Sequence, residues 1–454
     1  MTDNSFLSAI DRNQESIIAL ADTIWDNPET AFREFKSSEA ITSFLTERGF
    51  TVAKGVAGLP TAFIASFGNG HPEIGFIAEF DALPGISQQA MVPTQKRLEG
   101  VVNGHGCGHH LYAGDAVAAA LAVQEYLRQS GNSGTVKVLG CPGEEGGSGK
   151  AYMAREGLFK SLDAAFGGHP ECFWAVRTRP SLACCNILYK FDGRASHAGA
   201  KPHLGRSALD AVELMNVAVN FLREHIPYDK RVHSAITDSG GDAPNIVQPH
   251  AEVMYMMRAK DNADLNALCK RVDLCAQGAA LATETTFSSQ FRSASSNLIT
   301  IPTLQRTLHQ AMLDVPLPQP DSNDIAFANE MVKILIDRTP DMPLYPDAVL
   351  PLPDQIAPHF GSTDTGDVSW NCPTVQMHVG SWIPGTPNHS WQTVAQGKNG
   401  YARRAMLYAG KAMALAAVRL IETPELIAAA KKEHLERTGG KYEPAMPPDV
   451  MPSL

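Results

Sequence analysis

The sequence contains no apolar run long enough to cross a membrane. The apolar stretch from Ala405 to Leu420 is interrupted by Gly410 and Lys411, whereas a spanning helix needs about 18 or more apolar residues in succession. The opening residues, MTDNSFLSAI, also lack the basic segment and apolar core of a secretory signal. We therefore expect a cytoplasmic protein with no membrane partner.

Basic residues and cysteines are also scarce. The 454 residues include 38 Lys and Arg against 48 Asp and Glu, a formal net charge of −10, which argues against nucleic acid as a partner. The 8 cysteines are too few for a disulfide framework, and Cys184 and Cys185 are adjacent and poorly placed to bridge. We expect the thiols to be reduced.

The chain does contain an alternation of short apolar runs with helical patterns. The runs 61–68 and 74–80 suit buried strands, 113–131 suits a helix, and 134–147 and 162–170 read as strands that end in Gly-rich loops. This alternation predicts an α/β domain with a mostly parallel sheet and helices on both faces. Its polar residues fall at strand C-terminal ends, where open α/β sheets bind ligands.

The middle of the chain has a different predicted order of strands and helices from the first part. Its pattern is β-α-β-α-β, with strands at 182–196, 251–260 and 285–294 and helices at 205–225 and 264–282. We expect a catalytic domain made of residues 1–181 and 298–454, and an inserted α+β domain over 182–297. Other expected features are helices at 4–48, 303–314, 323–337 and 399–421, loops at 339–358, GSTDTGDVSW and GTPNHSW, and a polar tail from Gly439.

Several loops carry residues that bind metals. Cys107 and His109, in GHGCGHHLYAGDA, are two residues apart and could face one ion from an extended loop. Glu144 and Glu145 end a strand, where adjacent carboxylates need a cation nearby. His169 lies between Gly168 and Pro170, and His389 follows Gly385 and Pro387. Taken singly, each has a plain alternative: a packing cysteine, a solvated acidic turn or a structural histidine.

Together these residues suit a two-metal centre for amide hydrolysis. Cys107, His109, Glu145, His169 and His389 number enough for two ions, and Glu144 would be the general base beside a shared water. Zinc or manganese is expected, and cobalt is also compatible with this ligand set.

The chain resembles the di-metal aminoacylase/carboxypeptidase family, metallopeptidase family 20. Within its amidohydrolase branch it is similar to the B-subunit type of aminobenzoyl-glutamate hydrolase, over about residues 10–425. The segments that carry the resemblance are AEFDALPG, NGHGCGHH, GCPGEEGGSGKAYM, GGHP, ASHAGAKPHLGRSALDAVELM, GDAPNIVQP and GSTDTGDVSW with GTPNHS. The resemblance implies a zinc-exopeptidase-like α/β domain with an inserted ferredoxin-like dimerisation lid.

The resemblance also implies roles for single residues. The five ligand candidates match the metal ligands of the branch, Glu144 matches the base, and Asp81 matches an aspartate that supports a ligand. His197 matches a histidine that crosses a dimer interface to polarise the scissile carbonyl, and Asn245 and Arg258 match residues that hold substrate. Taken alone, His197 could be a histidine in a turn. Arg258 lies in an apolar strand, so its charge should pair with either an internal acidic residue or a substrate carboxylate.

Three positions depart from the family pattern. Glu79 stands where more distant members have a metal-binding histidine, although this branch also has a carboxylic acid there. His110 stands where many relatives have Asp or Asn, and is either an extra ligand or a pocket residue. The motif HAGAKPH is one residue longer than usual, so His203 receives no role.

We expect a hydrolase that cleaves N-acyl or N-aroyl amino acids, with aminobenzoyl-glutamate-like substrates and a homodimeric assembly, or one with a related A-type subunit. One alternative is a dipeptidase of the same family, because the metal motifs do not separate the two activities. Trp370, Trp382 and Trp391 could line an aromatic acyl pocket, but tryptophans more often belong to the core. A second alternative is a catalytically silent partner subunit.

Overall fold

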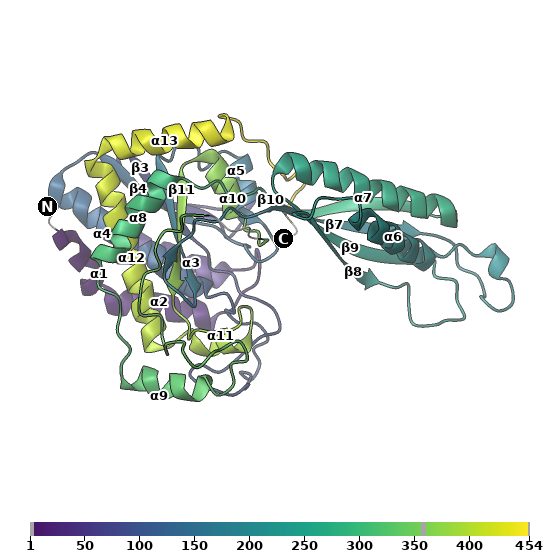
Figure 1. The fold of residues 1–454 in the computed structure, drawn as a ribbon, viewed down its shortest axis with the longest axis horizontal. Helices are drawn as coiled ribbons and strands as arrows, with labels where there is room; N and C mark the ends of the chain where they lie inside the picture. Colours follow the sequence, from purple (N-terminus) through teal and green to yellow (C-terminus); the bar gives the residue numbers. More distant parts are fainter. Residues whose placement is uncertain (1–3, 356–359, 453–454) are drawn as a thin grey trace.

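Two β-sheets of different kinds organise the chain in the computed structural model, which describes residues 4–355 and 360–452 (Figure 1). The larger sheet lies in an α/β body that holds both ends of the described chain. The smaller sheet belongs to an arm that projects from this body. None of the described helices is long and apolar enough to cross a membrane.

The sheet of the body has seven strands in the order β1-β2-β4-β3-β5-β11-β6. Their bounds are β1 Thr51–Lys54, β2 Phe63–Asn69, β3 Glu73–Ala78, β4 Gly134–Gly140, β5 Ala164–Glu171, β6 Ala175–Val176 and β11 Thr374–Gly380. The four central strands, β4, β3, β5 and β11, are parallel, and the outer pairs are antiparallel. The central strands therefore end at a common edge.

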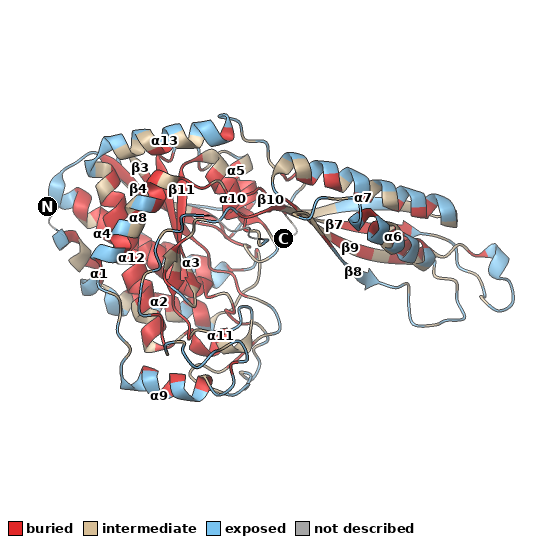
Figure 2. Cartoon of the chain, viewed as in Figure 1, coloured by how far each residue is buried: buried red, intermediate tan, exposed pale blue. Residues whose placement is uncertain are grey.

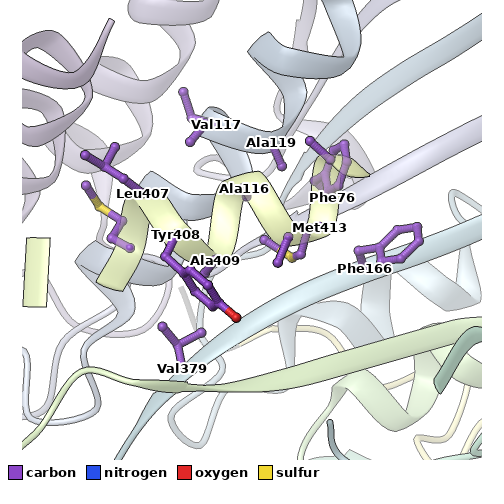
Figure 3. Close-up of a cluster of buried hydrophobic side chains, with 14 of the residues drawn as sticks. Phe76, Ala116, Val117, Ala119, Phe166, Val379, Leu407, Tyr408, Ala409 and Met413 are labelled. Carbon is purple, nitrogen blue, oxygen red and sulfur yellow. The ribbon is translucent and has the colours of Figure 1, made fainter. Parts of the chain in front are cut away.

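Helices cover both faces of this sheet, as the alternating pattern predicts. Alternate residues of β3 point to opposite faces: Phe76 joins the core beside α4 (His109–Ser130) and α12 (Gly400–Glu422). Ile77 joins the core beside α5 (Gly149–Arg155) and α10 (Thr365–Asn371). Figure 3 shows α12 packed against α4 in the first of these cores.

Seven further α-helices of the described residues lie in the body. They are α1 Ser8–Arg12, α2 Gln14–Asp26, α3 Phe35–Glu47, α8 Pro302–Asp314, α9 Ser322–Met331, α11 Trp391–Gln396 and α13 Pro424–Thr438. Helix α13 and strands β1 and β11 were not expected from the sequence, and the segment of α10 was expected to be a loop. The expected loop at 339–358 holds one isolated bridge, at Val349, and no other strand or helix over 339–355. Its last three residues lie outside the described part.

The projecting arm is built on a four-stranded antiparallel sheet in the order β10-β7-β9-β8. Its strands are β7 Ala183–Asp192, β8 Arg231–Asp238, β9 His250–Ala259 and β10 Thr286–Ser295, and its helices are α6 Ala208–Arg223 and α7 Asn262–Thr283. The chain order is therefore β-α-β-β-α-β, the ferredoxin-like pattern. The predicted β-α-β-α-β order is wrong in one respect, because it lacks the strand β8 between α6 and β9.

Local sequence signals set the ends of the two arm helices. The side chain of Ser207 accepts a hydrogen bond from the backbone N–H of Asp210, and Asp261 does the same for Asp264, so each helix begins at a capped turn. The inner faces of both helices are buried against the sheet, whereas their outer faces are exposed (Figure 2).

Candidate metal centre

The ligand candidates meet at the edge where the central strands end. Glu79 and Asp81 follow β3, and Glu144 and Glu145 lie in the loop after β4. The others are His169 near the end of β5, Cys107 and His109 at the start of α4, and His389 just before α11. The parallel strands thus gather, at one place, side chains that are far apart in the sequence.

Three groups of these residues have ligand atoms within 4.8 Å of one another. The groups are Cys107 with His109 and His169, Cys107 with Glu145 and His389, and Glu79 with His109 and Glu144. The Cys107 Sγ lies 3.3 Å from His169 Nε2, and Glu145 Oε1 lies 3.2 Å from His389 Nε2. All five candidate ligands therefore converge, and Cys107 is common to two groups.

The start of α4 sets the geometry of Cys107 and His109. The expected helix start near residue 113 is wrong, because α4 begins at His109 itself. Gly108 precedes it with φ 81°, a left-handed conformation that glycine adopts at little cost. A Cβ at this position would lie 2.6 Å from Trp382 Cζ2. A glycine turn, rather than an extended loop, therefore separates the two ligand candidates.

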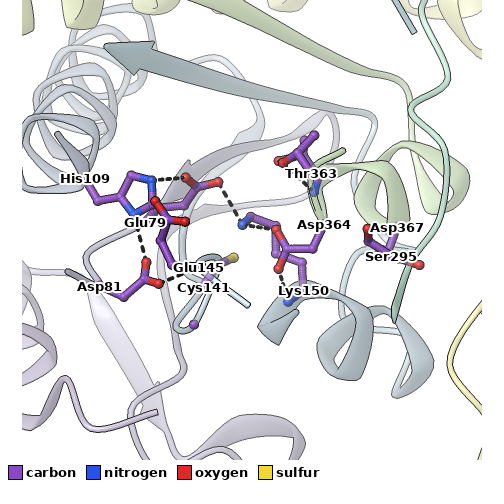
Figure 4. A network of polar contacts seen from close by, with 12 residues as sticks. Glu79, Asp81, His109, Cys141, Glu145, Lys150, Ser295, Thr363, Asp364 and Asp367 are labelled. Atoms are coloured by element: carbon purple, nitrogen blue, oxygen red, sulfur yellow. Dashed lines mark hydrogen bonds and ion pairs between the residues drawn. The ribbon is translucent and has the colours of Figure 1, made fainter. Parts of the chain in front are cut away.

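Asp81 supports two of the candidate ligands at once (Figure 4). Its Oδ1 lies 2.8 Å from His109 Nδ1, and its Oδ2 accepts a hydrogen bond of 2.8 Å from the backbone N–H of Glu145. Burial raises the pKa of Asp81, but the charge and hydrogen bond of His109 outweigh this and hold it below its usual value. The Nδ1–H is thus held by a carboxylate, which directs the Nε2 lone pair of His109 into the site.

A buried network of charges extends from the site through Glu79 (Figure 4). Glu79 Oε2 lies 3.3 Å from His109 Nε2, and Glu79 Oε1 lies 2.8 Å from Lys150 Nζ. Lys150 also lies 2.6 Å from Asp364 Oδ1. Burial lowers the pKa of Lys150, but the carboxylates of Asp364 and Glu79 outweigh it and raise that pKa well above its usual value.

Glu144 and Glu145 diverge, as expected for adjacent residues at a turn. Glu145 faces His389, whereas Glu144 lies in the group with Glu79 and His109. Burial, followed by the charges of Glu79 and Glu145, raises the pKa of Glu144 to about 7. A carboxylate with such a pKa can both take up and release a proton near neutrality.

His389 reaches the site from a strained loop. Its φ is 56°, which is unusual for a residue with a side chain. Its backbone N–H donates to the carbonyl of Gly106, 3.1 Å away, so the loop is fixed to the segment that carries Cys107. The His389 side chain is 52% exposed, which leaves this flank of the site open to solvent.

The residues present fit divalent metal ions. His109 Nε2, Glu79 Oε2 and Glu145 Oε1 are buried, and the partners within reach are other ligand candidates: His109 Nε2 and Glu79 Oε2 lie 3.3 Å apart, and Glu145 Oε1 lies 3.2 Å from His389 Nε2. None of the three atoms forms a regular hydrogen bond with a described residue, and such buried atoms are costly unless something else binds them. The donors are imidazole, thiol and carboxylate groups, which are the ligands of zinc and related metals.

His197, expected to polarise the scissile carbonyl, and Asn245 and Arg258, expected to hold substrate, lie on the arm. His197 and Asn245 are neighbours there, because the backbone N–H of Ala198 donates to the carbonyl of Asn245, 2.9 Å away. Both are exposed, and neither belongs to the three ligand groups. Arg258 lies where the arm joins the body and donates to Ser362 Oγ and to the carbonyl of Phe360, at 3.0 and 3.3 Å.

His110 and His203 are not in any of the three ligand groups. His110 is fully buried and its Nε2 lies 2.9 Å from the carbonyl of Gly397, while His203 is exposed. Trp382 is part of the core. Lys150 and Asp364 are not predicted at the site, because no local sequence pattern marks them. Glu79 is notable in the sequence only because it stands where more distant family members have a metal-binding histidine, and no role is predicted for it.

Comparison with known proteins decides the family. A family model described as peptidase family M20/M25/M40 matches residues 75–451. The chain belongs to this family. It is 42% identical to the B component of the p-aminobenzoyl-glutamate hydrolase of Escherichia coli, over 98% of this chain and 97% of that protein. It is 32% identical to the mouse Xaa-Arg dipeptidase, over 93% of this chain and 90% of that protein.

The fold agrees with that of a solved M20 protein. A dinuclear metal-binding peptidase of family M20 from Bacillus subtilis matches with a TM-score of 0.60 and 17% identity, over 91% of this chain and 99% of that one. M20 membership, with the identity to the E. coli protein along nearly the whole chain, makes this protein a hydrolase that acts on amide bonds.

Proposed function

We propose that this M20 hydrolase uses two divalent metal ions to cleave N-acyl or N-aroyl amino acids, with aminobenzoyl-glutamate-like substrates. The convergence of five candidate metal ligands, one of which, His109, also groups with Glu144, carries the proposal. The E. coli relative, named as a component of an aminobenzoyl-glutamate hydrolase, supports the choice of substrate. We further propose zinc or manganese as the metal, with cobalt also compatible, and a cytoplasmic location.

Cys107, His109, Glu145, His169 and His389 would hold the two ions, with Asp81 orienting His109. Glu79 is also near enough to contribute an oxygen. The ions would polarise the scissile carbonyl and make a water molecule nucleophilic at neutral pH. Glu144 would accept a proton from that water and deliver it to the leaving amine, a task that suits its raised pKa.

His197 would stabilise the oxygen of the carbonyl as it gains negative charge. The backbone N–H groups of Gly199 and Ala200 both donate to His197 Nδ1, at 3.2 and 3.1 Å. Nδ1 is therefore an acceptor, and the proton of the neutral ring must sit on Nε2. His197 thus presents an N–H donor to its surroundings, as an oxyanion donor requires.

The position of His197 supports the proposal that a second chain completes each site. The strand β7 begins at the body and has ten residues, Ala183–Asp192, which extend it by about 30 Å. His197 follows its far end. We therefore propose that residues 182–297 form a lid and dimerisation domain on a catalytic domain of residues 1–181 and 298–454. The second chain is a further copy or a related A-type subunit, since the name of the E. coli relative makes it one component of a hydrolase.

Asn245 and Arg258 would hold the substrate, Arg258 through a carboxylate. No carboxylate of a described residue forms a salt bridge with Arg258, which supports a substrate acid over an internal one. A dipeptidase is the second candidate function, favoured by the identity to the Xaa-Arg dipeptidase. A catalytically silent subunit is the third, and the complete set of ligands and base argues against it.

The deciding experiment measures metal content and hydrolysis on the same preparation. Purified protein is loaded with zinc or manganese, analysed for metal, and assayed with p-aminobenzoyl-glutamate, other N-acyl amino acids and dipeptides. We expect bound divalent metal and faster turnover of the acyl amino acids than of dipeptides. Faster dipeptide cleavage would favour the second candidate, and no turnover of any substrate by the metal-loaded protein would favour the third.

A further inference from the structure

Arg177 is a cation beside the candidate metal centre that has no acidic partner among the residues the structure describes. Its side chain is partly buried, yet no carboxylate of a described residue lies within salt-bridge distance of it. Burial lowers the pKa of Arg177, while the charges of Tyr112, Glu144 and Glu171 raise it, which shows that these groups are its electrostatic neighbours. A guanidinium in such a place normally pairs with a carboxylate.

The backbone fixes Arg177 close to a metal ligand. It directly follows β6, whose Ala175 pairs with His378 of β11, and His378 pairs in turn with His169 of β5. The backbone N–H of Arg177 donates to the carbonyl of Gln376, 2.9 Å away. Three neighbouring strands therefore hold the guanidinium on the same side of the body as His169.

The side chain of Gln376 orients the guanidinium. Its amide nitrogen donates to Tyr112 Oη and Thr365 Oγ1, at 3.0 and 3.3 Å, so its carbonyl oxygen is free to accept. That oxygen accepts a hydrogen bond of 3.2 Å from Arg177 Nη1. A single neutral acceptor thus positions the group, and most of its five N–H donors stay available for a ligand.

The nearby acids already have other partners. Glu79 is held by Lys150, and Glu144 is the proposed base. Glu171 accepts from Asn388 at 3.5 Å and lies 3.8 Å from His169 Nδ1. An internal carboxylate is therefore a poor explanation for Arg177.

We propose that Arg177 binds a carboxylate of the leaving amino acid and selects dicarboxylic residues such as glutamate, in company with Arg258. This inference rests on the proposed function and adds to it a residue that determines specificity. Arg258, at the junction with the arm, also forms no salt bridge with a described residue. Two such arginines, one on the body and one on the arm, match the two carboxylates of such a leaving group.

The test compares Arg177→Gln and Arg177→Lys with Arg179→Gln as the matched control. Arg179 is two residues further along the same segment and is exposed. The substrates are p-aminobenzoyl-glutamate and its two monoamides, in which either the α- or the γ-carboxylate is replaced by a carboxamide. Metal content and thermal unfolding are measured for every variant, to show that the fold and the centre are intact.

For Arg177→Gln we expect kcat/KM on the diacid to fall by about 10- to 100-fold, mainly through KM, as for the loss of one hydrogen-bonded charged group. The monoamide that lacks the carboxylate bound by Arg177 should be cleaved equally by this variant and the wild type, whichever monoamide that is. The kcat/KM of Arg177→Lys on the diacid should lie between those of Arg177→Gln and the wild type, and the kcat/KM of Arg179→Gln should match that of the wild type. An equal loss on all three substrates, or no loss on any, would overturn the inference.

A binding measurement separates this inference from the proposed function. If the metal-loaded wild type cleaves no acyl amino acid, the proposed function fails. The binding of L-glutamate and of L-glutamine to the same protein is then compared by calorimetry. A preference for glutamate that disappears in Arg177→Gln would still support a carboxylate site, and the absence of any preference in the wild type would reject it.

Discussion

Glu79 Oε1 lies 2.8 Å from Lys150 Nζ, and both side chains are sealed from solvent. The other Glu79 oxygen faces His109. Lys150 therefore neutralises a carboxylate that borders the candidate metal centre, and Asp364 balances the lysine in turn. Burying charges is costly, and removing one member of such a set leaves the others uncompensated.

Replacing Lys150 with Met should lower the free energy of unfolding by about 3 to 5 kcal/mol, because two buried carboxylates lose their counter-charge. Metal affinity should fall as well. Burial raises the pKa of Glu79, and without the opposing charge of Lys150 the carboxyl group would hold its proton more tightly and compete with a metal ion. Denaturant unfolding and metal titration measure the two effects. The control is Lys160→Met on the surface. Equal stability of the two variants would show that the network does not support the fold.

Removing the sulfur of Cys107 should weaken both proposed ions, because its Sγ belongs to two ligand groups. We expect Cys107→Ala to lower the affinity of both steps of a metal titration by at least about 10- to 100-fold, the range already found for residues that only support ligands. His389→Ala should affect one step, since His389 is in one group. The control is Cys275→Ala in α7. Two unchanged steps in Cys107→Ala would contradict a shared ligand.

Replacing Glu144 with Gln should reduce kcat by about 10²- to 10⁴-fold, the usual contribution of a general base, and should leave the metal content unchanged. The exposed Glu99 offers a matched control, Glu99→Gln. Steady-state kinetics and elemental analysis of the same samples test this. A rate close to that of the wild type would remove Glu144 from its assigned role.

Mixing two inactive variants should restore activity if His197 acts in a second chain. A Glu144→Gln chain and a His197→Ala chain can combine so that one site of the pair has both residues intact. For freely mixing dimers we expect recovery of about a quarter of the wild-type rate. The measurement is the rate after the two proteins are denatured and refolded together, compared with each refolded alone. No recovery, with dimers formed, would place His197 outside the neighbouring site.

Replacing Gly108 with Ala should cost about 2 to 5 kcal/mol, because the left-handed backbone disfavours a side chain and the new Cβ would collide with Trp382. Gly131 has a similar φ of 66° with nothing within 4 Å of a Cβ. Gly131→Ala should therefore cost only about 1 to 2 kcal/mol. Thermal or denaturant unfolding of both variants separates the collision from the backbone strain.

The convergence of the candidate metal ligands could be predicted because each lies in a short motif, either at the end of a strand or in a loop that leads into a helix. The parallel sheet then brings the strand ends together without further information. The ferredoxin-like unit was largely visible for a similar reason, since α6 and α7 have clear caps and amphipathic patterns.

What escaped prediction depends on distant contacts or on exposure. The strand β8 is exposed along most of its length, so its sequence lacks the alternation that marks a strand. Lys150 gives no local sign of burial, because its partner Asp364 is 214 residues away. The sequence around Arg177 likewise gives no sign that it lies near the site, since only the pairing of three strands brings it beside His169.

The length of β7 also has a genetic consequence. In the proposed assembly of two chains, His197 at the end of this arm serves a neighbour's reaction rather than that of its own polypeptide. Consider a cell that makes equal amounts of an intact chain and of a chain that has lost both its metal centre and its His197. Mixed dimers would then have no complete site, so the cell would lose more than half of its activity.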